Sequence, residues 1–91
     1  MEARHYIIKG KVQGVGYRYF TKEAASGLSL RGWVKNILDG NVECLVSGKI
    51  ESLEIFEKKL RKGPPLSRVV NMEKKVILPG EIDIPETFEI N

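Results

Sequence analysis

The chain has 91 residues, of which 42% are hydrophobic and 30% are charged, and its formal net charge is +3 with a sequence pI of about 9.1. This length suffices for one modest hydrophobic core, so we expect a single domain over residues 1–91. No apolar run approaches the roughly 20 residues of a membrane span, and Met1-Glu-Ala-Arg-His does not begin a signal peptide. We therefore expect a soluble cytoplasmic protein, with a monomer as the default at this size.

The chain contains one cysteine, Cys44, and one histidine, His5, which we expect at the surface. A lone cysteine cannot form an internal disulfide, which agrees with a reducing compartment. A Cys/His metal cluster is excluded as well, so any site must use Arg, Lys, Asn and backbone groups. The positive charge favours anionic partners, although much of it lies in Lys58–Lys62, where bases following acids complement a helix dipole.

The first elements expected along the chain are a strand and a helix. Polar and apolar side chains alternate over residues 4–12, which predicts a strand with a bulge or a close backbone approach at Gly10. Residues 18–26 favour a helix, in which we expect Phe20 in the core and Gly27 as the cap. The apolar side of the strand carries Tyr6, Ile8 and Val12.

A hairpin, a second helix and two further strands follow. Asp39-Gly40 is a strong turn signal, and Gly63-Pro64-Pro65 ends the second helix. The expected strands and helix cover residues 30–37, 42–47, 50–62, 67–76 and 87–90. Apolar side chains that share a face of their element are Val42, Cys44 and Val46, then Leu53, Phe56 and Leu60, then Val70 and Met72. Trp33 fits either the core or the open surface of the sheet.

The predicted order is β-α-β-β-α-β with a short terminal strand. This order is typical of an α+β, ferredoxin-like α/β sandwich, with two helices on one face of an antiparallel sheet. The right-handed crossover rule makes the first two strands parallel and inserts the third between them. Their carboxyl ends then reach the same edge of the sheet, which brings the loop at residues 13–17 close to Asn36.

The stretch Lys11–Phe20 has the order of a strand, a glycine-containing loop and a helix start. Gly14 and Gly16 can adopt backbone angles that let successive N–H groups converge on one anion. The first helical turn adds unpaired N–H groups, and Arg18 adds a planar set of donors suited to phosphate. Paired glycines and an exposed arginine also occur in ordinary loops, so the local pattern leaves both interpretations open.

Asn36 is the second polar residue expected at this edge. Its amide offers donors and an acceptor and does not titrate, so it could hold a water in line with a bound phosphorus atom. No Cys or His nucleophile is expected nearby, which favours direct attack by water on an activated phosphoryl group. Asn36 could equally serve only to shape the hairpin at Asp39-Gly40.

Two segments of the chain form recognisable motifs, Gly10-Lys-Val-Gln-Gly-Val-Gly-Tyr-Arg18 and Gly32-Trp-Val-Lys-Asn36. They resemble the first and second signatures of the acylphosphatases, and the resemblance covers nearly the whole chain. Gly63-Pro-Pro-Leu-Ser-Arg-Val69 and the closing Phe88-Glu-Ile90 also fit the pattern. The resemblance implies the α/β sandwich and the hydrolysis of acyl phosphates to a carboxylate and inorganic phosphate, without metal or cofactor.

The resemblance also assigns roles to residues. Arg18 and Asn36 would be catalytic, with Asn36 orienting the attacking water. Beyond what the resemblance implies, we expect the proton lost by that water to pass to the substrate phosphate, because no base is in evidence. The phosphate would be held by Gln13, Gly14, Val15, Gly16, Tyr17 and Arg18.

Three positions depart from the family pattern. Lys11 stands where Arg is more usual, and Lys49 begins the second helix where an Asp cap is common. Ser29 stands where Gly is common, so a positive φ there would cost on the order of 1 kcal/mol. None of the three affects the predicted site.

Other functions are compatible with the same fold. One is a non-catalytic anion- or RNA-binding module, although the third strand offers no aromatic side chain of the kind that RNA-recognition domains use. A second is an acylphosphatase-like domain of a larger hydrogenase-maturation enzyme. The chain ends soon after its expected last strand, which argues against this function. A third is a degenerate, inactive relative, which Arg18 and Asn36 argue against.

Overall fold

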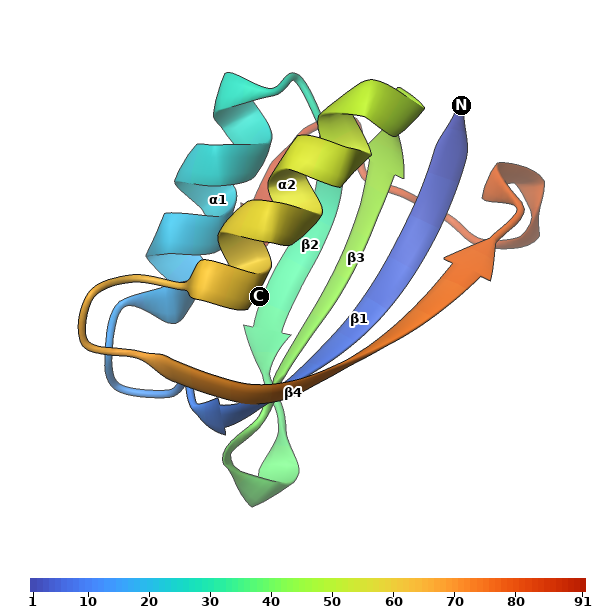
Figure 1. The fold of residues 1–91 in the computed structure, drawn as a ribbon. Coiled ribbons are helices and arrows are strands. Elements are labelled where there is room, and N and C mark those ends of the chain that lie inside the picture. Colours follow the sequence, from blue (N-terminus) through green and yellow to red (C-terminus); the bar gives the residue numbers. More distant parts are fainter.

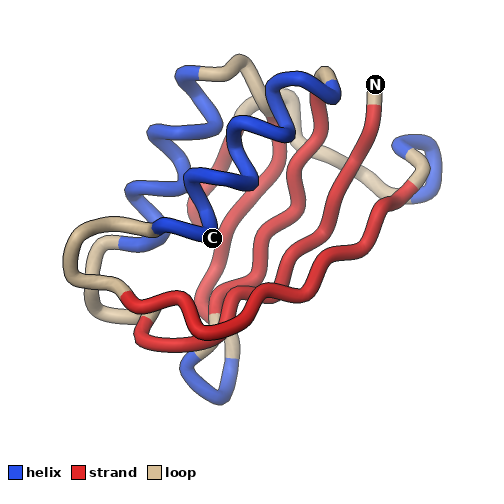
Figure 2. Tube along the Cα trace, viewed as in Figure 1, coloured by secondary structure: helices blue, strands red, loops and turns tan.

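The computed structural model describes residues 1–91 except for the side chain of Pro79. Figures 1 and 2 show one sheet with two helices packed side by side on one of its faces. The strands and helices follow the predicted order and differ from the predicted bounds by a few residues at most. They are β1 (Glu2–Lys11), α1 (Tyr17–Gly27), β2 (Arg31–Asn36), the 3-10 turn η1 (Leu38–Gly40), β3 (Val42–Gly48), α2 (Ile50–Lys62), β4 (Arg68–Ile77), the 3-10 turn η2 (Pro79–Glu81) and β5 (Phe88–Ile90).

The strand order in the sheet is β4-β1-β3-β2-β5. β3 pairs antiparallel with both β1 and β2, so these two strands are parallel to each other with β3 between them, as predicted. The predicted antiparallel pairing holds for β1 to β4, and the short last strand β5, whose pairing was not predicted, is parallel to β2. The chain after β4 runs behind the sheet to the opposite edge (Figure 1), and this crossing makes the sheet mixed.

Arg31 fastens this crossing segment to β2. Its Nε and Nη2 atoms donate to the carbonyl oxygens of Pro85 at 3.0 Å and Ile84 at 2.8 Å. Gly32 then donates its N–H to Thr87, and Gly32 has no room for a side chain, since a Cβ would lie 1.9 Å from the carbonyl oxygen of Leu45. The missing Cβ at Gly32 therefore lets β2 pack closely on β3, while the N–H of Gly32 pairs with the segment that leads into β5.

The core lies between the sheet and the two helices. Every side chain predicted for the core from β1, β3 and α2 is buried, and Cys44 is among them. Burial raises the pKa of the Cys44 thiol, and the negative charge of Glu43 raises it further. The thiol therefore stays protonated at neutral pH. Trp33 lies half-buried on the opposite, open face of the sheet, 5.2 Å from the Lys35 Nζ atom.

The buried face of helix α1 differs from the predicted one. Tyr17, Thr21 and Ala25 are buried, whereas Phe20 is only half-buried, so the prediction of Phe20 as a core residue was wrong. Gly27 is the last helical residue and not the cap. The left-handed residue after the helix is Ser29, with φ 56°, so the condition under which a backbone cost was expected at that position is met.

The bulge expected at Gly10 is present and changes which side chains of β4 face the core. Lys9 pairs with Asn71 and Gly10 with Val69, so Val70 is the extra residue. Val70 is 72% exposed, and Val69 packs against the core in its place. The prediction that Val70 shares the buried face of Met72 was therefore wrong, because the bulge shifts the alternation by one residue.

Helix α2 is joined to the sheet by a charged cluster as well as by its apolar side. Arg4 on β1 is only 4% exposed, and its guanidinium donates to Glu54 at 2.8 Å and to Glu57 at 3.3 Å. Glu57 also accepts a hydrogen bond from the Tyr6 hydroxyl and pairs with Lys74. The acidic side chains of α2 thus belong partly to a buried network, which the interpretation as a solvated helix face missed.

Candidate active site

The loop between β1 and α1 turns on two glycines. Gly14 has φ 73° and Gly16 has φ 79°, angles in the left-handed region that side chains with a Cβ disfavour. Gly16 is the N-cap of α1, and its carbonyl oxygen accepts the N–H of Phe20 at 3.0 Å. Among the hydrogen bonds of the described residues, none uses a backbone N–H from Gly14 to Tyr19 as the donor. These N–H groups are therefore available to an anion at the start of the helix.

A hollow of about 220 Å³ opens beside this loop. It is smaller than most sites for drug-sized ligands, which measure about 300–1,000 Å³. It lies where the carboxyl ends of β1 and β2 meet, and it brings Arg18 and Asn36 to one place as the predicted topology requires. Its lining consists of Val12, Gly14, Gly16, Tyr17, Arg18, Tyr19, Asn36 and Ile90.

Arg18 is held in place from the other edge of the sheet. Its Nη1 atom donates to the carbonyl oxygen of Asn91 at 3.3 Å, and the N–H of Asn91 donates to Val34 on β2 at 2.9 Å. This is the one hydrogen bond found for Arg18 within the described structure, so most of its five donors can reach a ligand. Sequence reasoning missed Ile90 and Asn91 as part of this region, although Phe88-Glu-Ile90 had been matched to a family pattern.

Asn36 is the last residue of β2 and is exposed. The turn that follows is formed by Asp39 and Gly40, both in the left-handed region, with φ 72° and 79°. A backbone hydrogen bond of 3.0 Å from Ile37 to Asn41 closes the hairpin. The Asn36 side chain forms no hydrogen bond in the described structure, so the hairpin does not depend on its amide.

Two residues of the predicted phosphate loop use their side chains elsewhere. The Gln13 Nε2 atom donates to the carbonyl oxygens of Ile37 at 2.9 Å and Asn41 at 2.8 Å, which ties the loop to the hairpin. The buried Tyr17 hydroxyl donates to the carbonyl oxygen of Leu60 at 2.6 Å, and burial raises its pKa. Gln13 and Val15 do not line the hollow, and Val15 packs against the core.

The hollow differs from a metal or acid–base site in its lining. Its described side chains include no carboxylate, imidazole or thiol, and the described residues form no group of three or more His, Cys, Asp and Glu that could hold a metal ion. His5 lies on the open face of the sheet, where its Nε2 atom is 2.7 Å from Glu43.

None of the described helices is long and apolar enough to cross a membrane.

The fold and this hollow define a class of protein: a small α+β sandwich with a glycine loop, an arginine and an asparagine gathered at the ends of two parallel strands. A family model described as acylphosphatase matches residues 4–90. The acylphosphatase of Nitratidesulfovibrio vulgaris is 44% identical over 90 residues, which cover 99% of this chain and 90% of the relative. The chain belongs to the acylphosphatase family.

Other relatives and solved structures agree with this assignment. The acylphosphatase of Koribacter versatilis is 50% identical over 72 residues, covering 79% of this chain and 66% of that protein. The crystal structure of the acylphosphatase from Bacillus subtilis superposes with a TM-score of 0.91 at 36% identity, over 100% of this chain and 99% of that one. Full-length HypF is also similar, with a TM-score of 0.87 at 30% identity, but the match covers only 12% of its chain.

Proposed function

We propose that the protein is an acylphosphatase, which hydrolyses the carboxyl–phosphate anhydride bond of small acyl phosphates to a carboxylate and inorganic phosphate. The observation that carries this proposal is the hollow in which the free N–H groups of the loop, Arg18 and Asn36 face one small space. Each of these groups supplies what phosphoryl transfer to water requires, namely charge neutralisation and position.

The phosphate of the substrate binds to the N–H groups of residues 14–19 at the start of α1. The partial positive charge of the helix N-terminus and the guanidinium of Arg18 neutralise its negative charge. Arg18 forms one exposed hydrogen bond of 3.3 Å to Asn91 and lines the hollow, so its guanidinium starts close to the phosphate site. The phosphorus atom then lies close to Asn36 at the end of β2.

Asn36 accepts a hydrogen bond from a water molecule and holds it in line with the bond to be broken. The water oxygen forms a bond to phosphorus as the bond between phosphorus and the acyl oxygen breaks. The leaving carboxylate has a low pKa and needs no general acid. The proton of the water passes to the phosphate, because the hollow offers no carboxylate or imidazole in its described lining.

Gln13 and Tyr17 act as positioning residues. Gln13 joins the phosphate loop to the hairpin that carries Asn36, and Tyr17 joins the first turn of α1 to the end of α2. Both residues remain part of the proposed phosphate-binding loop, in which the free N–H groups begin at Gly14.

The first test is the hydrolysis of benzoyl phosphate, followed by ultraviolet absorbance in the presence of EDTA. We expect turnover in the wild type, and a loss of at least about a thousandfold in kcat/KM for Arg18→Ala, because a charge-assisted contact to the transferred group is lost. Arg18→Lys keeps the charge without the planar donors and should recover only part of the activity. A folded wild type without activity would contradict the proposal.

We also infer that residues 1–91 form a single domain that works as a cytoplasmic monomer, with phosphate as product and inhibitor and without a nucleic-acid or membrane partner. The ordinary composition and the one shared core support this inference. Sedimentation equilibrium at several protein concentrations would test the monomer.

A further inference from the structure

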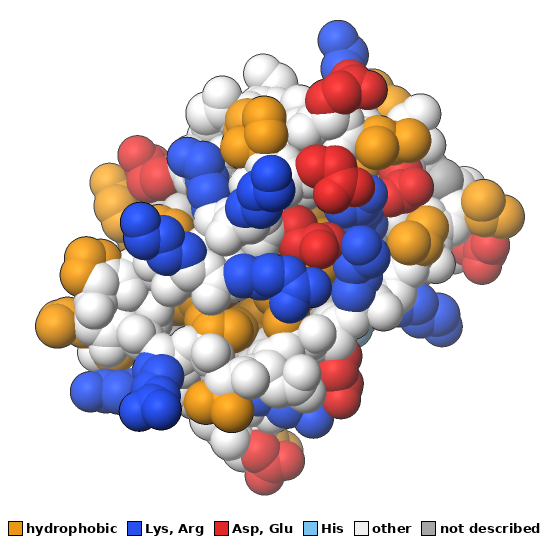
Figure 3. All heavy atoms as spheres, viewed as in Figure 1, with side chains coloured by type: hydrophobic (Ala, Val, Ile, Leu, Met, Phe, Trp, Pro, Cys, Tyr) orange, Lys and Arg blue, Asp and Glu red, His pale blue; other side chains and the backbone are white. Residues whose placement is uncertain are grey.

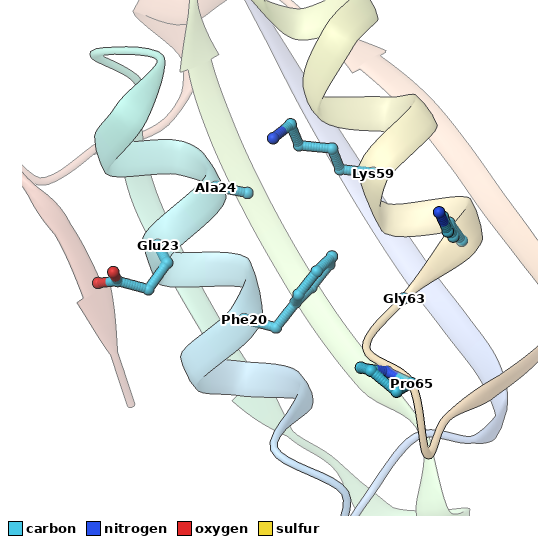
Figure 4. Close-up of a pocket in the computed structure, with 7 residues that line it drawn as sticks. Phe20, Glu23, Ala24, Lys59, Gly63 and Pro65 are labelled. Atoms are coloured by element: carbon cyan, nitrogen blue, oxygen red, sulfur yellow. The ribbon is translucent and has the colours of Figure 1, made fainter.

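A second and larger hollow lies between α1 and α2. Its volume is about 670 Å³, within the range of small-molecule sites. Figure 4 shows Phe20 on α1 and Lys59 on α2 extending into the space between the two helices from opposite sides. Phe20, which lines it, lies two residues after Arg18 on α1, so the two side chains point to different sides of that helix. The residues that line it are Phe20, Glu23, Ala24, Lys59, Lys62, Gly63 and Pro65.

The floor of this groove is apolar and held in place. The half-buried Phe20 ring faces the groove, and Ala24 packs against the core beneath it. At one end, Gly63 has φ 69° and is buried, with the Tyr17 ring 3.2 Å from the position of a Cβ. Ser67 donates through its hydroxyl and its N–H to the carbonyl oxygen of Pro64, at 2.7 Å and 3.0 Å. The loop after α2 is therefore fixed, and the groove does not have to form when a ligand arrives.

Lys59 and Lys62 give one rim of the groove a positive charge. They are three residues apart on α2 and so lie on the same side of the helix, and both are exposed. Neither has a carboxylate within 4.0 Å among the described residues. The third charged residue of the lining, Glu23, points away from the groove, whereas Lys59 extends into it (Figure 4).

The helix dipole of α2 accounts for basic residues in its last turn, but it does not favour one side of the helix over another. Phe20, Ala24 and Pro65 would gain from an apolar ligand, and they lie directly beside two unpaired cations. Figure 3 shows this combination on the molecular surface, where basic side chains border exposed apolar atoms on the side of the helices. An apolar body with one negative group is the ligand chemistry that satisfies both features.

We propose that the groove between α1 and α2 binds a small amphipathic carboxylate, with its hydrocarbon chain on Phe20, Ala24 and Pro65 and its head group between Lys59 and Lys62. The loop at Gly63–Pro65 closes one end of the groove, which favours a short chain over an extended peptide. This site is separate from the hollow at Arg18, and the proposal does not depend on the proposed hydrolysis.

The probe for this site is octanoate, measured by isothermal titration calorimetry and by amide chemical shifts. Octanol and octylamine have the same chain with a neutral or a positive head group. The charge variant is Lys59→Met together with Lys62→Met, which removes both cations and keeps the apolar stems. Lys58→Met is the matched control, since Lys58 is an exposed lysine of the same helix that does not line the groove. A parallel titration of Arg18→Ala separates this site from the proposed catalytic site.

We expect saturable binding of octanoate, with shifts centred on residues 20–24 and 59–65. Octanol should bind about tenfold more weakly, and octylamine more weakly still. The double variant should lose about tenfold in affinity for octanoate and become insensitive to salt, while Lys58→Met and Arg18→Ala bind as the wild type does.

Three results would overturn the proposal. They are the absence of saturable binding by the folded wild type, equal affinity for octanoate and octanol, and equal weakening by Lys58→Met and the double variant. Binding that disappears in Arg18→Ala would place the carboxylate at the other hollow and would also refute this site. If the charge variants give the expected result, Ala24→Trp should abolish binding by filling the groove, provided that its circular dichroism matches the wild type.

Discussion

Asn36 shares a small hollow with Arg18 but carries no charge, so the two residues should affect catalysis differently. Asn36→Ala removes the acceptor for the attacking water and leaves the phosphate contacts in place. We expect kcat to fall by about a hundredfold and KM to change by less than about threefold. Steady-state kinetics with benzoyl phosphate measures this difference, with Asn71→Ala on the exposed part of β4 as the control. An unchanged kcat would show that Asn36 does not orient the water.

Ser29 affects the stability of the protein through its backbone conformation and not through its side chain. Its φ of 56° is left-handed, a region that glycine enters without strain. Ser29→Gly should therefore stabilise the protein by about 1 kcal/mol and leave kcat unchanged, because the residue does not line the hollow. Urea unfolding measures the free energy. Lys22→Gly, at an exposed position in the middle of α1, is the control and should destabilise by a similar amount, since glycine weakens a helix interior.

The charged cluster beneath α2 joins this helix to two strands, β1 and β4. Burial raises the pKa of Glu57, but hydrogen bonds from Tyr6, Lys74 and Arg61 outweigh it and lower the pKa below its ordinary value. A lowered folded pKa means that the ionised carboxylate stabilises the protein above the ordinary pKa of a glutamate. This contribution is lost as the pH falls through the folded value.

Glu57→Gln should consequently destabilise the protein by about 2 kcal/mol near pH 7, because it leaves Tyr6 and Lys74 with a weaker acceptor. The difference from the wild type should shrink as the pH falls below the ordinary pKa of a glutamate and through the lower folded value, because the wild-type carboxyl group is then protonated too. Unfolding in urea at a series of pH values measures it. Glu51→Gln is the control on the exposed first turn of α2, and a pH-independent difference for Glu57→Gln would contradict this account.

The elements themselves were largely predictable, because each depends on local sequence. Periodicity located the helices and strands, the Asp39-Gly40 turn gave the hairpin, and the buried side chains of β3 and α2 followed from spacing. The errors came from interactions outside the element. The bulge opposite Gly10 reversed the side of Val70, and the position of α2 determined that Phe20 borders a groove.

At the scale of the whole molecule, the crossover rule placed Arg18 and Asn36 on the same edge, because the parallel order of β1 and β2 allowed no other arrangement. The edge that β5 joins could not be predicted in this way. It depends on how the segment after β4 crosses the sheet, and on the carbonyl oxygens that Arg31 reaches on the far side. Asn91, which contacts Arg18, was missed for the same reason.

The same long-range dependence applies to Gln13, which connects two segments that are distant in sequence. Its amide donates to the carbonyl oxygens of Ile37 and Asn41, so it sets the position of the hairpin, and hence of Asn36, relative to the phosphate loop. Gln13→Met has a similar length but no donor, and both carbonyl oxygens lose a partner. We expect kcat to fall about tenfold as Asn36 shifts, since small misplacements at a reacting centre are costly.

The inhibition constant of inorganic phosphate decides between the two roles of Gln13. If the side chain only positions the hairpin, Gln13→Met should leave phosphate binding within about twofold of the wild type, because the backbone N–H groups and Arg18 are retained. A side chain that contacts the phosphate directly would instead raise the inhibition constant by about tenfold or more. Combining Gln13→Met with Asn36→Ala adds an independent check. When Gln13 acts through Asn36, the double variant should be no slower than Asn36→Ala alone.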